Sequence, residues 1–188
     1  PDLTANDTGP KLLLWNAEMR ADRPAMREKY LGIWQTWSWR KVSDEVRNIA
    51  IGFMQLGVRR GDRIAIIGDN RPRLYWSVYA AQALGGVPVP IYQDAVAEEM
   101  LYVLENAEVK FVIAENQEQV DKVLEIKDRC PLLEAVIYDD PRGLRDYQLP
   151  NLHNFDDLVV DAGKNANEYR DTYLKEVAIG KGSDTSIM

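Results

Sequence analysis

Cysteine and histidine are almost absent from this chain of 188 residues, which contains one of each. Cys130 has no partner for an internal disulfide. It precedes Pro131 at a predicted helix end with no base near it in sequence, which indicates a structural thiol rather than a nucleophile. His153 lies in a predicted loop at residues 150–154, and one histidine without a second histidine or a cysteine pair makes no recognisable metal site. A chain without disulfides fits a reducing compartment, so we expect a cytoplasmic protein.

Long apolar runs are missing as well. The longest, at residues 77–92, is interrupted by Gly85, Gly86, Pro88 and Pro90 and is too short to cross a bilayer. The apolar block at residues 12–15 is too brief for a secretory signal peptide. We therefore expect no membrane span.

The usual nucleotide-binding and catalytic motifs are also missing. No G-x-G-x-x-G follows a predicted strand, and Gly180-Lys181-Gly182-Ser183 lacks both the upstream glycine and the Gly-Lys-Ser/Thr order of a phosphate loop. No Ser or Cys nucleophile is paired with a histidine in a recognisable motif. The chain therefore offers no catalytic residue and no metal ligand, and we interpret it as a scaffold without a reaction centre.

Positive charge is the minority sign: 23 Lys and Arg stand against 30 Asp and Glu, a formal net charge of −7. Nucleic-acid-binding surfaces are basic, so we expect no nucleic-acid partner. Five arginines fall near one predicted loop, and we interpret them as solvated charges around that loop end: Arg59, Arg60, Arg63, Arg71 and Arg73.

Three segments precede the predicted parallel sheet. Residues 1–10 are polar and are expected to form a disordered linker, and residues 11–20 show the spacing of a short amphipathic helix. Residues 24–39 predict a β-hairpin with its turn at Leu31-Gly32. Its aromatic side chains suggest either a stacking platform or a face packed against the next helix, and we favour the packed face: Tyr30, Trp34, Trp37 and Trp39.

From there to residue 138 the pattern alternates between helices and apolar strands. Ser38 is expected to cap a helix whose apolar stripe runs through Val42, Val46, Ile49, Phe53 and Leu56. Strands are predicted at residues 63–67, 87–91, 110–114 and 134–138, with helices at 73–84, 96–107 and 117–128 between them. This alternation predicts an α/β fold, a doubly wound and mainly parallel sheet flanked by helices, with the hairpin at its N-terminal side. Short helices near 154–161 and 168–177 follow.

Several segments resemble the adenylate-forming (AMP-dependent) synthetases. They are Trp37-Ser38-Trp39 with the helix that follows, residues 61–72 with Trp76, and Ala80-Ala81-Gln82-Ala83-Leu84-Gly85-Gly86-Val87-Pro88-Val89-Pro90. Residues 91–94 and 115–122 are most similar to the long-chain fatty-acyl-CoA synthetase branch. The resemblance covers roughly residues 11–188, so we expect one N-terminal α/β subdomain over that range.

The resemblance implies a two-step reaction, in which a carboxylate and ATP form an acyl-adenylate and the acyl group then passes to coenzyme A. It implies ATP, Mg²⁺ and coenzyme A for the parent enzyme, with a fatty acid as the substrate. Residues 182–188 resemble the lead-in to the family's phosphate loop. The chain is therefore expected to be a truncated piece, inactive alone, whose parent is cytoplasmic or peripheral to a membrane.

One loop is a candidate ligand contact. Ligands bind beyond the carboxyl ends of strands in open α/β sheets, and Tyr92, Gln93 and Asp94 follow such a strand. In some coenzyme A-forming relatives the corresponding loop is glycine-rich and borders the pantetheine channel, so the resemblance implies a cofactor-binding role for these three residues. Here Gln93 and Asp94 stand where those glycines would be. The alternative is structural: Asp94 caps the next helix, just as Asn70 adopts a left-handed turn and caps the helix at Pro72.

Two other functions remain open. The chain can belong to another adenylate-forming branch, such as an aryl-CoA ligase or an amino-acid adenylation domain. It can also be a self-standing α/β interaction module. A truncated piece should expose apolar surface and unpaired strand edges, so we expect the isolated chain to self-associate.

Overall fold

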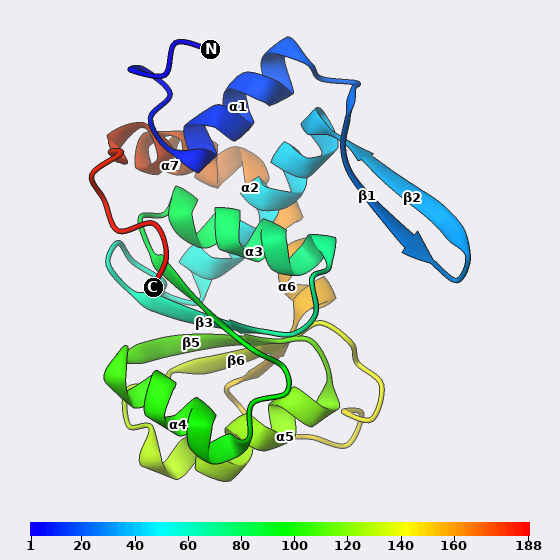
Figure 1. Ribbon diagram of the computed structural model, residues 1–188, viewed down its shortest axis with the longest axis vertical. Coiled ribbons are helices and arrows are strands. Elements are labelled where there is room, and N and C mark those ends of the chain that lie inside the picture. The colour runs from blue at the N-terminus through cyan, green and yellow to red at the C-terminus, as the bar shows by residue number, and fades with distance from the viewer.

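A five-stranded parallel sheet forms the centre of the molecule, with helices on both of its faces (Figure 1). The computed structural model describes residues 1–188. The strands are β3 (Arg63–Ile67), β4 (Val87–Ile91), β5 (Val109–Ala114), β6 (Ala135–Tyr138) and β7 (Leu152–Asn154). The predicted fold class, an α/β fold with a parallel sheet flanked by helices and an N-terminal hairpin, is confirmed.

Five helices lie on one side of the sheet: α2 (Trp39–Gln55), α3 (Pro72–Ala83) and α6 (Phe155–Lys164), with α1 (Gly9–Met19) and α7 (Ala166–Ile179) packed on these helices. The opposite face is covered by α4 (Ala97–Asn106) and α5 (Gln117–Ile126), which a 3₁₀ turn at Lys127–Arg129 follows. Adjacent strand residues therefore enter different cores. Ile64 packs under α2 and α3, and Ala65 packs over α4. This burial on both sides explains why the strands are almost continuously apolar.

The strand order is β4-β3-β5-β6-β7, and every neighbouring pair is parallel. The chain leaves β3 toward α3 on one face and leaves β5 toward α5 on the other face. The loops after these two adjacent strands therefore diverge, and the carboxyl edge between them is the topological switch point of the sheet. This is the position at which open α/β sheets bind their ligands.

The helix signals in the sequence are confirmed with small shifts. The Ser38 hydroxyl accepts a hydrogen bond from the Lys41 N–H at 3.3 Å and caps α2, whose predicted apolar stripe is buried except at its last residue, Leu56, which is partly buried. Thr8 caps α1, which begins two residues earlier than predicted. Cys130 is buried, and burial raises the pKa of its thiol, as expected for a structural cysteine.

The N-terminal hairpin exists, but its predicted packing is wrong for its outer half. Strands β1 (Pro24–Tyr30) and β2 (Ile33–Ser38) pair antiparallel around Leu31-Gly32, whose φ angles of 47° and 82° define a tight left-handed turn. Only the base packs against the body, where Trp37 meets Trp76 edge to face at 5.5 Å. The rest projects away from the helices (Figure 1), with Trp34 64% exposed.

Four smaller predictions are also wrong. His153 lies in a short strand rather than a loop, because β7 pairs with β6. Neither Asn70 nor Asp94 is a helix cap: the first residue before α3 is Arg71, and the first before α4 is Val96, whose N–H is bonded by the Glu99 carboxylate. Asn70 does not adopt a left-handed conformation either.

The predicted arginine cluster does not form. Arg63 begins β3 whereas Arg71 and Arg73 follow its other end, so the strand length separates them. Four of the five are ion-paired rather than merely solvated: Arg60, Arg63, Arg71 and Arg73. Among the helices, none combines the length and the apolar character needed to cross a membrane.

Candidate functional site at the carboxyl edge of the sheet

Three adjacent strands are each followed by an acidic residue at the switch point of the sheet. Asp69 follows β3 after one glycine, Glu115 follows β5 directly, and Asp139 follows β6 directly. Because the strands are parallel, their carboxyl ends meet at one edge and bring these side chains together. The loop after β4 adds Gln93 at the same edge.

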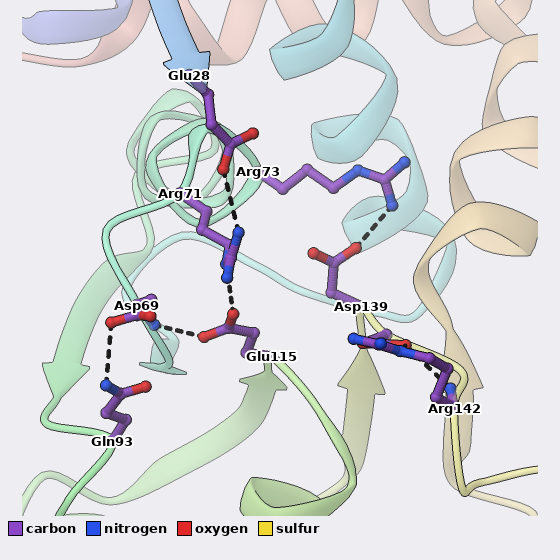
Figure 2. A network of polar contacts seen from close by, with 9 residues as sticks. Glu28, Asp69, Arg71, Arg73, Gln93, Glu115, Asp139 and Arg142 are labelled. Carbon is purple, nitrogen blue, oxygen red and sulfur yellow. Dashed lines mark hydrogen bonds and ion pairs between the residues drawn. The ribbon is translucent and has the colours of Figure 1, made fainter. Parts of the chain in front are cut away.

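Glu115 is the centre of a chain of polar contacts (Figure 2). It is 8% exposed, and its carboxylate accepts hydrogen bonds from the Asp69 N–H at 2.5 Å and from the Arg71 Nε at 2.6 Å. The Arg71 guanidinium also reaches the Glu28 carboxylate of the hairpin at 3.2 Å. These carboxylates raise the pKa of Arg71, and the hydrogen bond that Arg71 donates to Glu115 has the largest effect. Gln93 donates to Asp69 Oδ1 at 3.0 Å, so the chain of contacts joins the hairpin to three strand ends.

Gly68 is required for this arrangement. A Cβ at this position would lie 2.6 Å from the Glu115 Cβ and 2.7 Å from Leu74 Cδ1, far closer than real contacts allow. The absence of a side chain at Gly68 lets the β3 loop pass directly over Glu115. The sequence Gly68-Asp69 is therefore a close-approach motif, which positions the Asp69 N–H on the buried carboxylate.

A second pair of charges lies beside the first. Arg73 donates to Asp139 at 2.6 Å and forms an ion pair with Asp156 of α6 at 2.8 Å, while its guanidinium stacks over the Phe155 ring at 5.4 Å. Burial lowers the pKa of Arg73, but the two carboxylates outweigh burial and raise it overall. Burial raises the pKa of Asp139 by more than Arg73 lowers it. This pair connects the end of β6 to α3 and α6.

These residues border an open cavity of about 700 Å³ between the hairpin, the start of α3 and the loops after β5 and β6. Three arginines line it, and each is held by a carboxylate: Arg71 by Glu115, Arg73 by Asp139 and Arg142 by Asp140. With Glu28, Glu45 and Asp156 also lining the cavity, carboxylates outnumber guanidinium groups six to three around it. The cavity is therefore net negative.

This charge balance does not suit a polyphosphate, and the carboxylates do not converge as metal ligands do. An ATP phosphate site needs free cations or unoccupied backbone N–H groups, and every arginine here already has an anionic partner. No group of three or more Asp, Glu, His or Cys converges closely enough to hold a metal ion. The residues of this edge therefore do not fit a Mg²⁺ or triphosphate site, and we derive no chemical step through one.

Of the predicted cofactor-binding residues, the structure brings one into this network. Gln93 bonds Asp69, and its own carbonyl accepts from Lys122 Nζ at 2.8 Å. Tyr92 is 88% exposed and lines an apolar cavity of about 430 Å³ together with Leu74 and Ile187. Asp94 is exposed and makes no polar side-chain contact. A cofactor-binding role for Tyr92, Gln93 and Asp94 stays a prediction.

Sequence reasoning missed the residues that form the network: Asp69, Arg71, Arg73, Glu115 and Asp139. A pattern that could have revealed them was present. Three predicted parallel strands are each followed within two residues by a carboxylate, and such residues must gather at one edge. The partnership of Glu115 with Arg71 could not be predicted, because 44 residues separate them along the chain.

The fold and this edge together define an open-sheet α/β subdomain, in which loops from several strands meet at a switch point. The AMP-binding enzyme family matches residues 13–171 of the chain. The chain therefore belongs to the AMP-binding enzyme family.

Individual relatives agree with this assignment. The chain is 32% identical over 139 residues to the long-chain-fatty-acid–CoA ligase ACSBG2 of Xenopus laevis, covering 73% of this chain and 18% of that protein. It is 40% identical over 89 residues to an uncharacterized protein of Mycobacterium tuberculosis, which is 47% of this chain and 50% of that protein. Coronafacic acid ligase from Pectobacterium brasiliense shares the fold, with a TM-score of 0.71 at 19% identity, over 80% of this chain and 29% of the ligase. The chain thus spans less than a fifth of the length of the Xenopus ligase.

Proposed function

We propose that these residues are the N-terminal scaffold of an ATP-dependent long-chain acyl-CoA synthetase. In this proposal the parent joins a fatty acid to ATP to form an acyl-adenylate and then transfers the acyl group to coenzyme A, with Mg²⁺ offsetting the phosphate charge. The similarity to a long-chain-fatty-acid–CoA ligase over 73% of the chain supports the substrate class. A cytoplasmic location belongs to the same proposal.

The scaffold part of the proposal rests on the arginines at the carboxyl edge of the sheet, none of which is free to bind a ligand. Every arginine there is paired with a carboxylate, and the cavity is net negative. The edge therefore positions loops from the hairpin, α3 and α6 relative to one another, and none of its arginines is free to polarise a phosphate. We propose that the 188 residues alone do not form acyl-adenylate or acyl-CoA.

A direct assay tests both parts. The purified 188-residue chain is incubated with ATP, Mg²⁺, coenzyme A and a long-chain fatty acid, and pyrophosphate and acyl-CoA are measured. We expect neither product from this chain. We expect both from a protein that contains it together with the remaining length of the ligases. Product formation by the isolated chain would overturn the scaffold proposal. A parent that accepts aryl acids or amino acids but no fatty acid would overturn the substrate class.

A second candidate function has one specific observation in its favour. The mycobacterial relative is matched over half of its own length, so the fold is also found in a protein that is much shorter than the ligases. A self-standing α/β interaction module of the same family is therefore the alternative. A reading frame that continues beyond codon 188 into the rest of a ligase would eliminate it.

A further inference from the structure

The outer half of the β1–β2 hairpin is exposed along its whole length. Residues 29–36 are all exposed, and the ribbon extends away from the helical body (Figure 1). Four large apolar side chains gather at its end, with exposed fractions of 54% for Tyr30, 84% for Leu31, 66% for Ile33 and 64% for Trp34. Single exposed apolar residues are ordinary, but a contiguous group on a projecting element marks an interaction surface.

The apolar end has no single face. Tyr30 pairs with Ile33 on one side of the ribbon, and the next pair, Lys29 with Trp34, points to the other side. Leu31 occupies the turn itself. A surface that docks on another protein would need one covered face, whereas an end that is apolar on both faces suits immersion in an apolar medium.

Basic residues follow directly behind the apolar end. Lys29 and Arg27 lie two residues apart and therefore point to the same side of the ribbon. Neither takes part in an ion pair. The intervening Glu28 faces the opposite side, where it shares the Arg71 guanidinium with Glu115. The side of the ribbon that carries Arg27 and Lys29 therefore has a free positive charge, although the chain as a whole carries −7.

The spacing of these residues matches the layers of a bilayer surface. At about 3.3 Å per residue, Lys29 lies roughly 7 Å and Arg27 roughly 13 Å behind the turn. Interfacial elements bury their apolar side chains about 5–10 Å deep, which places tyrosine and tryptophan at the headgroup boundary and the cations among the phosphates. We propose that the β1–β2 hairpin inserts its tip into the surface of a lipid bilayer that carries anionic headgroups.

This proposal does not depend on the reaction of the parent enzyme. It requires only that the tip of the hairpin is apolar and its flank basic, which the structure shows. A second copy of the chain is the competing occupant of the same surface. Two such hairpins would bring four uncompensated cations together, so the charge favours an anionic partner over self-association.

Vesicle co-sedimentation tests the proposal on the purified 188-residue chain. Vesicles of equal parts phosphatidylglycerol and phosphatidylcholine are compared with phosphatidylcholine vesicles, over a range of salt concentrations. We expect binding to the anionic vesicles, weakening as salt rises. We expect Leu31→Asn to reduce affinity about ten-fold because it removes the side chain at the tip.

The turn geometry makes Leu31→Asn a clean variant. Asparagine tolerates the left-handed φ of 47° better than leucine does, and Asn-Gly is the favoured pair for this turn, so the variant should fold at least as well.

The double variant Arg27→Gln/Lys29→Gln should lower the affinity for anionic vesicles about 25-fold, which is about five-fold for each cation removed. The matched control Arg145→Gln/Lys175→Gln removes the same charge from exposed, unpaired positions elsewhere and should bind as the wild type does.

Trp34 supplies an independent readout. Its fluorescence emission should shift to the blue on anionic vesicles, and Trp34→Thr should abolish that shift. Equal binding of the hairpin variants and the wild type, or equal binding to both kinds of vesicle, would overturn the proposal. Sedimentation equilibrium without lipid decides the competing case: a dimer that Leu31→Asn dissolves would assign the hairpin to a second copy instead.

Discussion

Glu115 is buried, and its carboxylate accepts hydrogen bonds from two donors on the loop after β3. Replacing it with alanine leaves the Asp69 N–H and the Arg71 Nε without their shared carboxylate. Both donors belong to exposed residues, where water replaces part of the lost interaction, so we expect Glu115→Ala to lower the free energy of unfolding by about 1–2 kcal/mol in urea denaturation. Glu118→Ala is the control, because Glu118 is exposed and pairs only within its helix. Its effect should stay within about 0.5 kcal/mol, and equal losses in the two variants would contradict the role of Glu115.

His153 offers a titration that can be observed without assignment ambiguity, because the chain has no other histidine. Its imidazole is half-buried in β7, and burial lowers its pKa in the folded protein below the usual 6.5. A lowered folded pKa means that the unfolded chain binds the proton more tightly. The stability from His153 is therefore present above pH 6.5 and is lost as pH falls through the folded pKa. Proton NMR of the imidazole should give a midpoint below 6.5, and His153→Gln should flatten the stability profile in that range. A midpoint at or above 6.5 would show that the ring is solvated.

For single residues, the sequence predicts which side chains lie at the carboxyl edge of the sheet better than it predicts which of them contact one another. That Asp69, Glu115 and Asp139 share one edge follows from parallel strands, once each is seen to follow a strand. That Glu115 must be buried does not follow, because it depends on Gly68 admitting the β3 loop at van der Waals contact. Tertiary contacts of this kind link residues that are dozens of positions apart, and no local pattern encodes them.

The first turn of α2 can be tested at the scale of the element. Ser38 ends β2 and caps α2 through the Lys41 N–H, and no acidic residue in the first turn assists it. We expect Ser38→Ala to lower the free energy of unfolding by about 1 kcal/mol, as loss of an N-cap does. Ser38→Asp retains an acceptor and adds a charge that suits the helix N-terminus, so it should match the wild type. A loss of the same size in both variants would assign the cost to β2 rather than to the cap.

Helices and central strands were predictable because each carries its own periodicity. The stripe of α2 and the apolar runs of β3 and β5 require burial on one or two faces, and the structure buries them. Strand β7 was not predictable, since its three residues are too few to show alternation. The hairpin was predicted as a pair of strands but placed wrongly, because alternating aromatic residues look the same whether a ribbon packs against a helix or projects from it.

For the whole molecule, the alternation of strands and helices predicted the class but not the order. The arrangement β4-β3-β5-β6-β7 requires the chain to cross back over β3 after β4, and nothing local specifies that turn. The order matters for function because it creates the switch point at which Asp69 and Glu115 meet. The strand order also determines which strands lie at the two edges of the sheet. Strand β4 presents Pro88 and Pro90, which lack N–H groups, and the Met188 N–H already occupies the Pro88 carbonyl at 3.1 Å.

Prolines on β4 and the shortness of β7 weaken both sheet edges as sites of strand pairing. Self-association of the isolated chain should therefore use side chains, and the apolar surface beside β4 offers them: Tyr75, Tyr92, Ile187 and Met188 are 45%, 88%, 53% and 63% exposed. We expect sedimentation equilibrium to show concentration-dependent association, which Tyr92→Asp and Ile187→Asp weaken because each introduces a charge into the contact. Leu31→Asn, at the distant hairpin, serves as the control and should leave the association unchanged. A chain that stays monomeric at high concentration would contradict this prediction, and association that survives both aspartate variants would locate the contact elsewhere.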